Sequence, residues 1–423
     1  MTRFLTACTL LVWMVASCAA AGAAVPDWPE WQGPKRDAVS TEKGLAQEWT
    51  GDGPPLLWKI EGLGKGFSTV SIVGNRIYTM GDRKDEQFII ALDLPTHKEL
   101  WAAKVGGPWG DGTRCTPTVE GGLVWAIGTR GDLVCVKADS GEEVWRKSFP
   151  KDFGGKMMSE WGYSESPLVD GDKLVCTPGG KDAGIVALNK KTGETIWQCA
   201  IPDIGGRGKD GAAYSSIVVS EGAGVRQYVT LMGRGAVGVA AKDGKFLWGY
   251  NKIANGTAII PTPVVRGDHV FVSSAYGTGA ALLKLSKDGD GVKADEVYFL
   301  GADTFQNHHG GMILMGDHIY AGHGHNAGQP ICIELGSGKI AWRAEDVPGG
   351  GSAAVLYADG NLYVRYESGV MALIQATPEK YALKGTFKIA VKNGPSWPHP
   401  VIHDGKLYLR DHDVLMCYDV SKK

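Results

Sequence analysis

Short apolar segments alternate with glycine-containing turns along almost the whole of this 423-residue chain. The stretch 166–197 shows the pattern in full: an apolar segment, the turn Asp170–Gly171, two further apolar segments separated by a glycine-rich loop, the turn Thr192–Gly193, and a last segment that ends at Trp197. Apolar residues that alternate with polar ones indicate β-strands, and these turn residues supply the positive φ that tight hairpins need. The stretch therefore predicts a four-stranded antiparallel sheet.

Copies of this unit recur along the chain, and a tryptophan closes most of them. Successive tryptophans lie 44 to 52 residues apart, or two such intervals apart, at Trp101, Trp145, Trp197, Trp248 and Trp342. The hairpin part of the unit recurs at 116–125 and 262–271, and more weakly at 72–78, 313–320, 356–363 and 400–408. With the divergent unit that ends at Trp248 there are eight units. Repetition at this period is typical of stacked units that bury their apolar faces against one another.

The two ends of the chain complement each other. The last unit has only three predicted strands, whereas an additional apolar segment at Leu56–Ile60 precedes the first unit. If this segment completes the last unit, the ring closes without free sheet edges. We therefore predict that residues 56–423 form one all-β domain, an eight-bladed β-propeller of four-stranded antiparallel blades closed by an N-terminal strand, and that 25–55 form an N-terminal extension.

The repeated tryptophans are interpreted as structural. Each is expected to stack on the glycine-containing turn of the adjacent blade, so truncation to alanine would cost about 3 to 5 kcal/mol. The residues concerned are Trp58, Trp101, Trp145, Trp197, Trp248 and Trp342.

Composition agrees with this fold and limits the partners. The chain has 61 glycines, 21% charged residues and a formal net charge of −2, which suits a turn-rich all-β protein and offers no basic surface for nucleic acid. Six cysteines follow the first 24 residues, on predicted strands and without a CxxC pair. In an exported protein they could form disulfides, but their scatter favours buried free thiols.

Residues 1–24 have the features of a secretory signal peptide: Arg3, an apolar run at 10–16 and small residues up to Ala24. We therefore expect export, to the periplasm or to the outer membrane and cell envelope. Two fates of the signal stay open. Val15–Cys18 resembles a lipobox, in which a lipidated Cys18 would attach the protein to a membrane, whereas Gly22–Ala24 suits ordinary cleavage.

The fold itself predicts where a ligand would bind. In a propeller, the segments that lead into the innermost strands lie on one face and converge around the axis, together with the loops between the second and third strands. A cation, a carboxylate and aromatic rings there would suit a planar, anionic or sugar-like ligand, although a solvated polar rim is the alternative. The predicted funnel residues are Arg114, Trp161, Glu165, Tyr214, His309, Trp397 and His399.

Four histidines gather in the sixth predicted blade. His308 and His309 lead into its innermost strand, and His323 and His325 begin its second-to-third loop. They could bind a divalent metal such as zinc or copper, or they could hydrogen-bond to the surrounding loops. Because neighbouring residues of a strand point to opposite faces, at most one of His308 and His309 is expected to face the funnel. The Asp-rich stretch 288–291 fails as a calcium loop.

The repeat resembles that of the pyrroloquinoline-quinone (PQQ) propeller superfamily, most clearly at Ala187–Trp197 and Ala91–Trp101. The segments Trp28–Asp37 and Asn307–Gly311 resemble one exported bacterial branch, the PQQ-binding-like repeat proteins. The resemblance implies one of two classes. Quinoprotein alcohol dehydrogenases hold the quinone in the funnel with calcium, an aspartate base and a vicinal disulfide, whereas outer-membrane assembly lipoproteins have the ring without a cofactor.

Several departures from the dehydrogenase pattern count against the first of these classes. The chain has no adjacent cysteine pair and no long insertions that could cover a cofactor, and it contains no nucleophile elbow, phosphate loop or HExxH motif. We therefore predict an exported, non-catalytic propeller, without catalytic residues or a required cofactor, that acts as a binding or scaffold module for an envelope protein or polymer. The alternative is a PQQ-dependent alcohol or sugar oxidoreductase with a degenerate cofactor site, which would use PQQ and a divalent metal. The sequence leaves the partner and the oligomeric state open.

Overall fold

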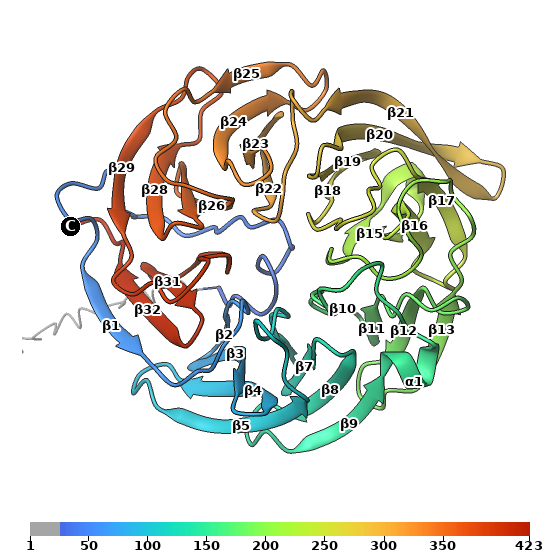
Figure 1. Ribbon diagram of the computed structural model, residues 1–423, viewed down its shortest axis with the longest axis horizontal. Helices are drawn as coiled ribbons and strands as arrows, with labels where there is room; N and C mark the ends of the chain where they lie inside the picture. The colour runs from blue at the N-terminus through green and yellow to red at the C-terminus, as the bar shows by residue number, and fades with distance from the viewer. Residues whose placement is uncertain (1–25) are drawn as a thin grey trace, which may run out of the picture.

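The computed structural model describes residues 26–423, and its sheets form a closed ring of eight blades (Figure 1). Each blade is a four-stranded antiparallel sheet, so the predicted eight-bladed propeller is confirmed. The only helices in this part of the chain are the short α1 (Phe149–Phe153) and the 3-10 turn η1 (Gly222–Gly224). None of its helices is long and apolar enough to cross a membrane. The predicted signal peptide and Cys18 lie outside the described residues.

In the first seven blades the strands run in chain order from the axis outward. They are β2 (Ser71–Val73), β3 (Arg76–Arg83), β4 (Glu86–Asp93) and β5 (Glu99–Gly106); β6 (Thr118–Glu120), β7 (Leu123–Ile127), β8 (Asp132–Lys137) and β9 (Glu143–Ser148); β10 (Leu168–Asp170), β11 (Lys173–Cys176), β12 (Ile185–Asn189) and β13 (Thr195–Cys199); β14 (Val218–Ser220), β15 (Gln227–Met232), β16 (Gly235–Ala240) and β17 (Phe246–Tyr250); β18 (Val264–Arg266), β19 (His269–Ser274), β20 (Gly279–Asp288) and β21 (Gly291–Gly301); β22 (Met312–Met315), β23 (His318–His323), β24 (Gln329–Glu334) and β25 (Ile340–Arg343); β26 (Ala353–Ala358), β27 (Asn361–Tyr366), β28 (Val370–Gln375) and β29 (Leu383–Lys388). The face of the ring on which the innermost strands begin is called the funnel face below.

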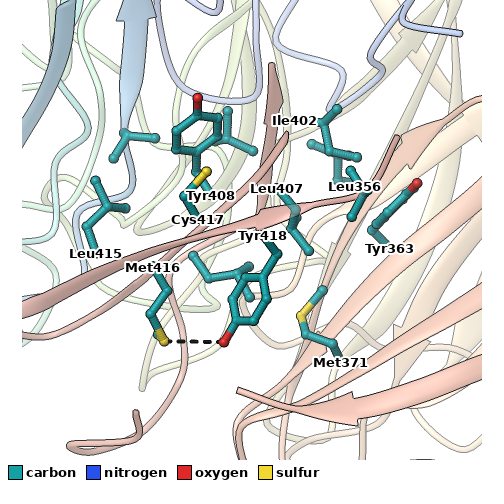
Figure 2. Packing of buried hydrophobic residues seen from close by; sticks show 14 of the residues in the cluster. Leu356, Tyr363, Met371, Ile402, Leu407, Tyr408, Leu415, Met416, Cys417 and Tyr418 are labelled. Atoms are coloured by element: carbon teal, nitrogen blue, oxygen red, sulfur yellow. Dashed lines mark hydrogen bonds between the residues drawn. The ribbon is translucent and has the colours of Figure 1, made fainter. Parts of the chain in front are cut away.

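The eighth blade combines both ends of the chain. Its strands are β30 (Val401–His403), β31 (Lys406–Asp411), β32 (Val414–Asp419) and the N-terminal β1 (Leu56–Ile60). β1 pairs antiparallel with β32, with Trp58 opposite Cys417, so the predicted closure is confirmed. Figure 2 shows side chains of the seventh and eighth blades, such as Met371 and Leu407, that belong to one buried apolar cluster.

Buried Arg410 joins the closing blade to the first blade. It is fully buried, and its guanidinium donates hydrogen bonds to the carbonyl oxygens of Leu63 and Gly64, at 3.2 and 3.0 Å, and to Thr79 Oγ1 at 2.6 Å. It also donates to the carbonyl oxygen of His412. Leu63 and Gly64 lie between β1 and β2, and Thr79 lies on β3, so one side chain holds the point at which the ring closes.

Every outermost strand carries a β-bulge at the same position. In all eight sheets the register between the third and fourth strands shifts by one residue. The expectation of a ring without free sheet edges is wrong, because the outermost strand of each blade stays unpaired on its outer side. A bulge interrupts the ladder that another strand would need, so the repeat protects these edges locally.

The tryptophan that follows the bulge docks on the next blade, as expected, in most of the ring. A Cβ atom added to Gly141, Gly193 or Gly244 would lie 2.5 to 2.8 Å from the ring of Trp101, Trp145 or Trp197, respectively, so glycine is required there. Trp58 and Trp342 also contact the next blade. The ring centroid of Trp58 lies 4.2 Å from that of His97, and Trp342 Nε1 donates a 2.8 Å hydrogen bond to the carbonyl oxygen of Thr377.

Trp248 departs from this pattern. Its indole donates a hydrogen bond of 2.6 Å to Gln227 Oε1 within its own blade. The next blade offers no glycine turn at the equivalent position, because β20 and β21 continue as a long hairpin. The prediction that Trp248 stacks on the adjacent blade's turn is therefore wrong.

A pair of glycines in the third blade tests the docking contact. Gly171 and Gly193 both have positive φ, at 60° and 73°, but a Cβ on Gly171 would meet nothing within 4 Å, whereas one on Gly193 would lie 2.8 Å from Trp145. We expect Gly171→Ala to cost about 1 kcal/mol of unfolding free energy, for the backbone alone, and Gly193→Ala about 2 to 4 kcal/mol, because overpacking adds to it. Urea unfolding measures both. Equal losses would show that the stacking is dispensable.

The predicted N-terminal extension crosses the axis of the ring. Residues 26–49, called the axial segment below, bridge Trp28 to Ile72 in the first blade and Val39 to Tyr357 in the seventh. The carboxylate of Asp27 accepts a hydrogen bond from Gly74 N, at a turn between first and second strands, which lies on the face opposite the funnel face. Figure 1 shows this dark blue segment running through the middle of the ring. It closes that face of the propeller.

The six cysteines of the described region are all buried and unpaired, which confirms the expected free thiols: Cys115, Cys135, Cys176, Cys199, Cys332 and Cys417. Burial raises the pKa of the Cys115 thiol to about 12, so these groups are unreactive core side chains at neutral pH.

Candidate functional site

A cavity of about 200 Å³ lies on the axis, between the axial segment and the loops that lead into the innermost strands. These loops come from seven of the eight blades. The cavity is lined by Trp31, Gln32, Phe67, Asp111, Arg114, Trp161, Ser164, Tyr214, Ser216, Ala258, Ile260, Pro261, Thr262, Tyr276, His308, His309, Gly311, Trp397, Pro398 and His399. Because the axial segment closes the other face, the cavity is a pit that is approached from the funnel face.

Six of the seven predicted funnel residues line this cavity: Arg114, Trp161, Tyr214, His309, Trp397 and His399. Trp161 is 44% exposed and lies at its mouth, whereas His399 is 5% exposed and lies deeper. Topology brings them together, because each of these residues precedes the innermost strand of its own blade and all these segments start on the funnel face.

Glu165 does not line the cavity, so its placement in the funnel was wrong. It is 1% exposed, and its carboxylate accepts a 2.6 Å hydrogen bond from Thr177 N while the other oxygen has no partner in the described chain. Neighbouring Ser164 faces the cavity, and alternation along an extended segment turns Glu165 into the core. Burial raises the pKa of Glu165 to about 7.

Sequence reasoning missed the floor of the cavity. Trp31 and Gln32 belong to the axial segment, and the Trp31 indole donates a 3.1 Å hydrogen bond to Thr262 Oγ1 in the fifth blade. In the sequence, the segment Trp28–Asp37 is distinguished only by its resemblance to one branch of the superfamily. Nothing in the repeat pattern indicates that a segment outside the ring would enter it.

The lining side chains carry no net charge at neutral pH. The Arg114 guanidinium forms two hydrogen bonds to the Asp111 carboxylate, at 2.7 and 2.8 Å. Burial lowers the pKa of His308 and of His399 to about 4, and lowers the pKa of His309 well below its usual value. The imidazoles are therefore neutral, and the only two ionised groups cancel.

The four histidines of the sixth blade are brought together only in part. The expectation that at most one of His308 and His309 faces the funnel is wrong: both line the cavity, because they lie in an irregular segment before β22, where strand alternation does not apply. The His308 ring lies 4.4 Å from that of His309 and 4.5 Å from that of His325, measured between centroids. Both nitrogens of His308 are occupied, Nε2 by the Tyr276 hydroxyl at 2.9 Å and Nδ1 by Ser352 Oγ at 2.8 Å.

His323 lies apart from the other three, where its Nδ1 accepts a 3.2 Å hydrogen bond from Gln306 N. Between residues 26 and 423 no three His, Cys, Asp or Glu side chains are arranged to hold a metal ion. The metal site therefore has no geometric support in this part of the chain.

Acidification is expected to destabilise the fold between about pH 6.5 and pH 4. Burial lowers the pKa of His308, His323 and His399 from 6.5 to about 4. In this window the unfolded chain binds more protons, so the free energy of unfolding falls by up to about 1.4 kcal/mol per pH unit for each histidine as the pH is lowered. Glu165, with its raised pKa, stays protonated in the folded state. Its effect on the free energy of unfolding is therefore opposite in sign and cancels that of about one histidine.

Urea unfolding at about pH 7 and about pH 5 measures this effect, and His399→Gln is expected to reduce the difference between the two values. Equal stability of the unsubstituted protein at both values would contradict the prediction.

An eight-bladed ring with tryptophan-closed blades and an axial cavity open on one face defines the PQQ-like propeller class. The profile described as "Outer membrane protein assembly factor BamB" matches residues 85–344. The chain belongs to this family.

Three comparisons describe the relationship. The chain is 26% identical over 255 residues to the BamB of Shewanella oneidensis, an alignment that covers 57% of this chain and 60% of that protein. Its structure is similar to that of BamB from Moraxella catarrhalis, with a TM-score of 0.61 and 13% identity, over 86% of this chain and 97% of the other. It is also similar to the quinohemoprotein alcohol dehydrogenase of Comamonas testosteroni, with a TM-score of 0.65 and 14% identity, over 94% and 81%. The two structural likenesses establish the fold and do not choose between the two functional classes.

Proposed function

We propose that this protein is an exported, non-catalytic propeller that binds a partner of the cell envelope, and that the partner docks on the funnel face. The observation that carries the proposal is the one-sided axial cavity. Loops of seven blades meet there, an exposed tryptophan stands at its mouth, and the axial segment closes the opposite face. Concave, aromatic-lined sites with few polar groups are typical of binding sites.

The relatives support an envelope role. The similar Shewanella protein is named an outer membrane protein assembly factor, although this chain spans only 60% of its length. The secretory features of residues 1–24 agree with the same compartment. Binding of an envelope protein or polymer is thus the function that the family and the cavity support together.

The cavity does not suit the dehydrogenase alternative. PQQ is a rigid, carboxylate-rich tricycle, and a site for it needs unpaired cations and a larger volume. The lining offers one guanidinium, which Asp111 already neutralises, and about 200 Å³, below the roughly 300 to 1,000 Å³ of typical cofactor pockets. The residues present therefore do not fit the quinone.

Site-specific cross-linking in intact envelopes tests the proposal. A photoreactive residue in place of Trp161, at the cavity mouth, is expected to capture a discrete partner, and Tyr214→Ala in the same chain is expected to weaken that capture. The matched control is the same residue in place of Val297, which is exposed on the outer strand β21. Capture at position 297 but not at 161, or dye-linked alcohol oxidation with added PQQ and calcium, would count against the proposal.

A further inference from the structure

The floor of the axial cavity contains a hydrogen-bonding side chain that the protein itself does not use, the amide of Gln32. Gln32 is 6% exposed, lines the floor of the cavity, and has no side-chain hydrogen bond among residues 26–423. His309 Nε2, Trp397 Nε1 and His399 Nδ1 also have no partner within the described chain, but neighbouring atoms enclose them, so a ligand in the cavity does not reach them. A polar group without a partner in a largely buried position costs about 1 to 3 kcal/mol, so the Gln32 amide, which lines the cavity, indicates a missing ligand.

Gln32 is held in place at a conformational cost. Its φ of 59° lies in the left-handed region that side chains other than glycine, asparagine and aspartate seldom adopt. Buried Arg36, four residues later, fixes the segment by donating to the carbonyl oxygens of Ser166 and Ile217, both at 3.0 Å. Strain that the surrounding structure maintains at a cavity is characteristic of functional positions.

The chemistry of these groups defines the ligand. The cavity is electrically neutral, since Arg114 and Asp111 pair and the imidazoles are uncharged, so it does not select an anion or a cation. Trp31, Trp161 and Trp397 provide aromatic faces, and the unpaired Gln32 amide calls for a hydroxyl or amide group on the same small molecule. A hydrocarbon side chain would leave the Gln32 amide unsatisfied, and a carboxylate would lack a cation.

We propose that the cavity binds one uncharged pyranose ring of an envelope glycan. A pyranose combines C–H faces that stack on tryptophan with hydroxyl groups around its edge, and a volume of about 200 Å³ admits a single ring. The Gln32 amide hydrogen-bonds to a hydroxyl or acetamido group at the deep end of the cavity, and Trp161 at the mouth stacks on the next sugar. This inference rests on the proposed function and names its partner class.

Titration of the full chain with uncharged disaccharides, namely chitobiose, cellobiose and maltose, tests the proposal by calorimetry and by tryptophan fluorescence. At least one of them is expected to bind, and Gln32→Met, which keeps the length and removes the amide, is expected to weaken that binding about tenfold or more. Gln32→Asn, which favours the left-handed backbone and withdraws the amide by one methylene, serves if the first variant does not fold. The matched control, Gln47→Met, alters an amide that bonds to Leu45 and Asp359 outside the cavity and is expected to leave affinity unchanged.

Two further probes test other classes of ligand against the glycan. PQQ and N-acetyltryptophan amide represent an anionic cofactor and an aromatic peptide side chain, and tighter binding of either one overturns the inference. So does the absence of saccharide binding, or saccharide binding that Gln32→Met leaves intact. Cross-linking of a protein at position 161 without saccharide binding would overturn the glycan and leave the proposed function standing, whereas failure of both would remove both.

Discussion

Replacing Arg410 with methionine is expected to lower the free energy of unfolding by about 3 to 5 kcal/mol. The substitution keeps most of the apolar stem but leaves four buried acceptors without a donor: the carbonyl oxygens of Leu63, Gly64 and His412, and Thr79 Oγ1. Each unsatisfied acceptor costs about 1 to 3 kcal/mol, partly relieved by local rearrangement and by the lower cost of burying a neutral side chain. Because these acceptors lie where the last blade meets the first, the loss is expected to include opening of the ring.

The matched control for this substitution is Arg83→Met. Arg83 lies at the end of β3, in the neighbouring blade, and its guanidinium pairs with Glu99 at 2.6 Å on a partly exposed surface. Exposed ion pairs contribute about 0 to 1 kcal/mol, so this variant is expected to stay near the stability of the unsubstituted protein. Urea unfolding compares the two, and hydrogen exchange at β1 reports opening of the ring. Similar stability of both variants would show that Arg410 does not hold the closure.

Replacing Arg36 with methionine is expected to cost about 3 to 5 kcal/mol and to disorder the cavity floor. Arg36 is 4% exposed and pairs with Glu30 at 2.6 Å, and it donates to carbonyl oxygens of the third and fourth blades. Burial raises the pKa of Glu30, so removal of the guanidinium leaves a carboxyl that is costly to ionise. The axial segment then loses its main attachment, and saccharide binding should be lost together with stability.

Lys35→Met is the control at the adjacent position. Lys35 is exposed and forms no ion pair in the described part of the chain, so its replacement is expected to change stability by about 0.5 kcal/mol or less. Thermal unfolding and quenching of tryptophan fluorescence follow both variants, because Trp31 is part of the same segment. An Arg36→Met protein that keeps a native cavity and full stability would contradict the role assigned to the axial segment.

The sequence predicted the ring well because the information for it is local and repeated. Each blade has its own hairpin turns and its own closing aromatic residue, so eight weak patterns reinforce one another, and the unmatched strand at Leu56–Ile60 supplies the closure. The same topology placed six candidate residues at one cavity although they are far apart in sequence. Glu165 was misplaced because a rule based on strand order ignores the alternation that turned it away from Ser164.

The floor of the cavity could not be predicted in this way. The axial segment has no regular strand and no repeat, and its position depends on long-range contacts such as those of Arg36 with two distant blades. The predicted stacking of Trp248 on the adjacent turn fails for a related reason, because the unusual length of the next blade's hairpin sets the environment of this side chain. Features that depend on a neighbouring element's length or on one buried side chain leave no periodic signal.

The two ends of the described chain leave the ring together. Lys422 N donates to the carbonyl oxygen of Gly44 at 2.8 Å, and Asp27 contacts the turn at Gly74, so both ends lie on the side that the axial segment closes. A linker or solid support attached at either end would therefore approach from behind the pit. Immobilised or displayed molecules would all present the cavity outward, and their orientation would be uniform whichever end is chosen.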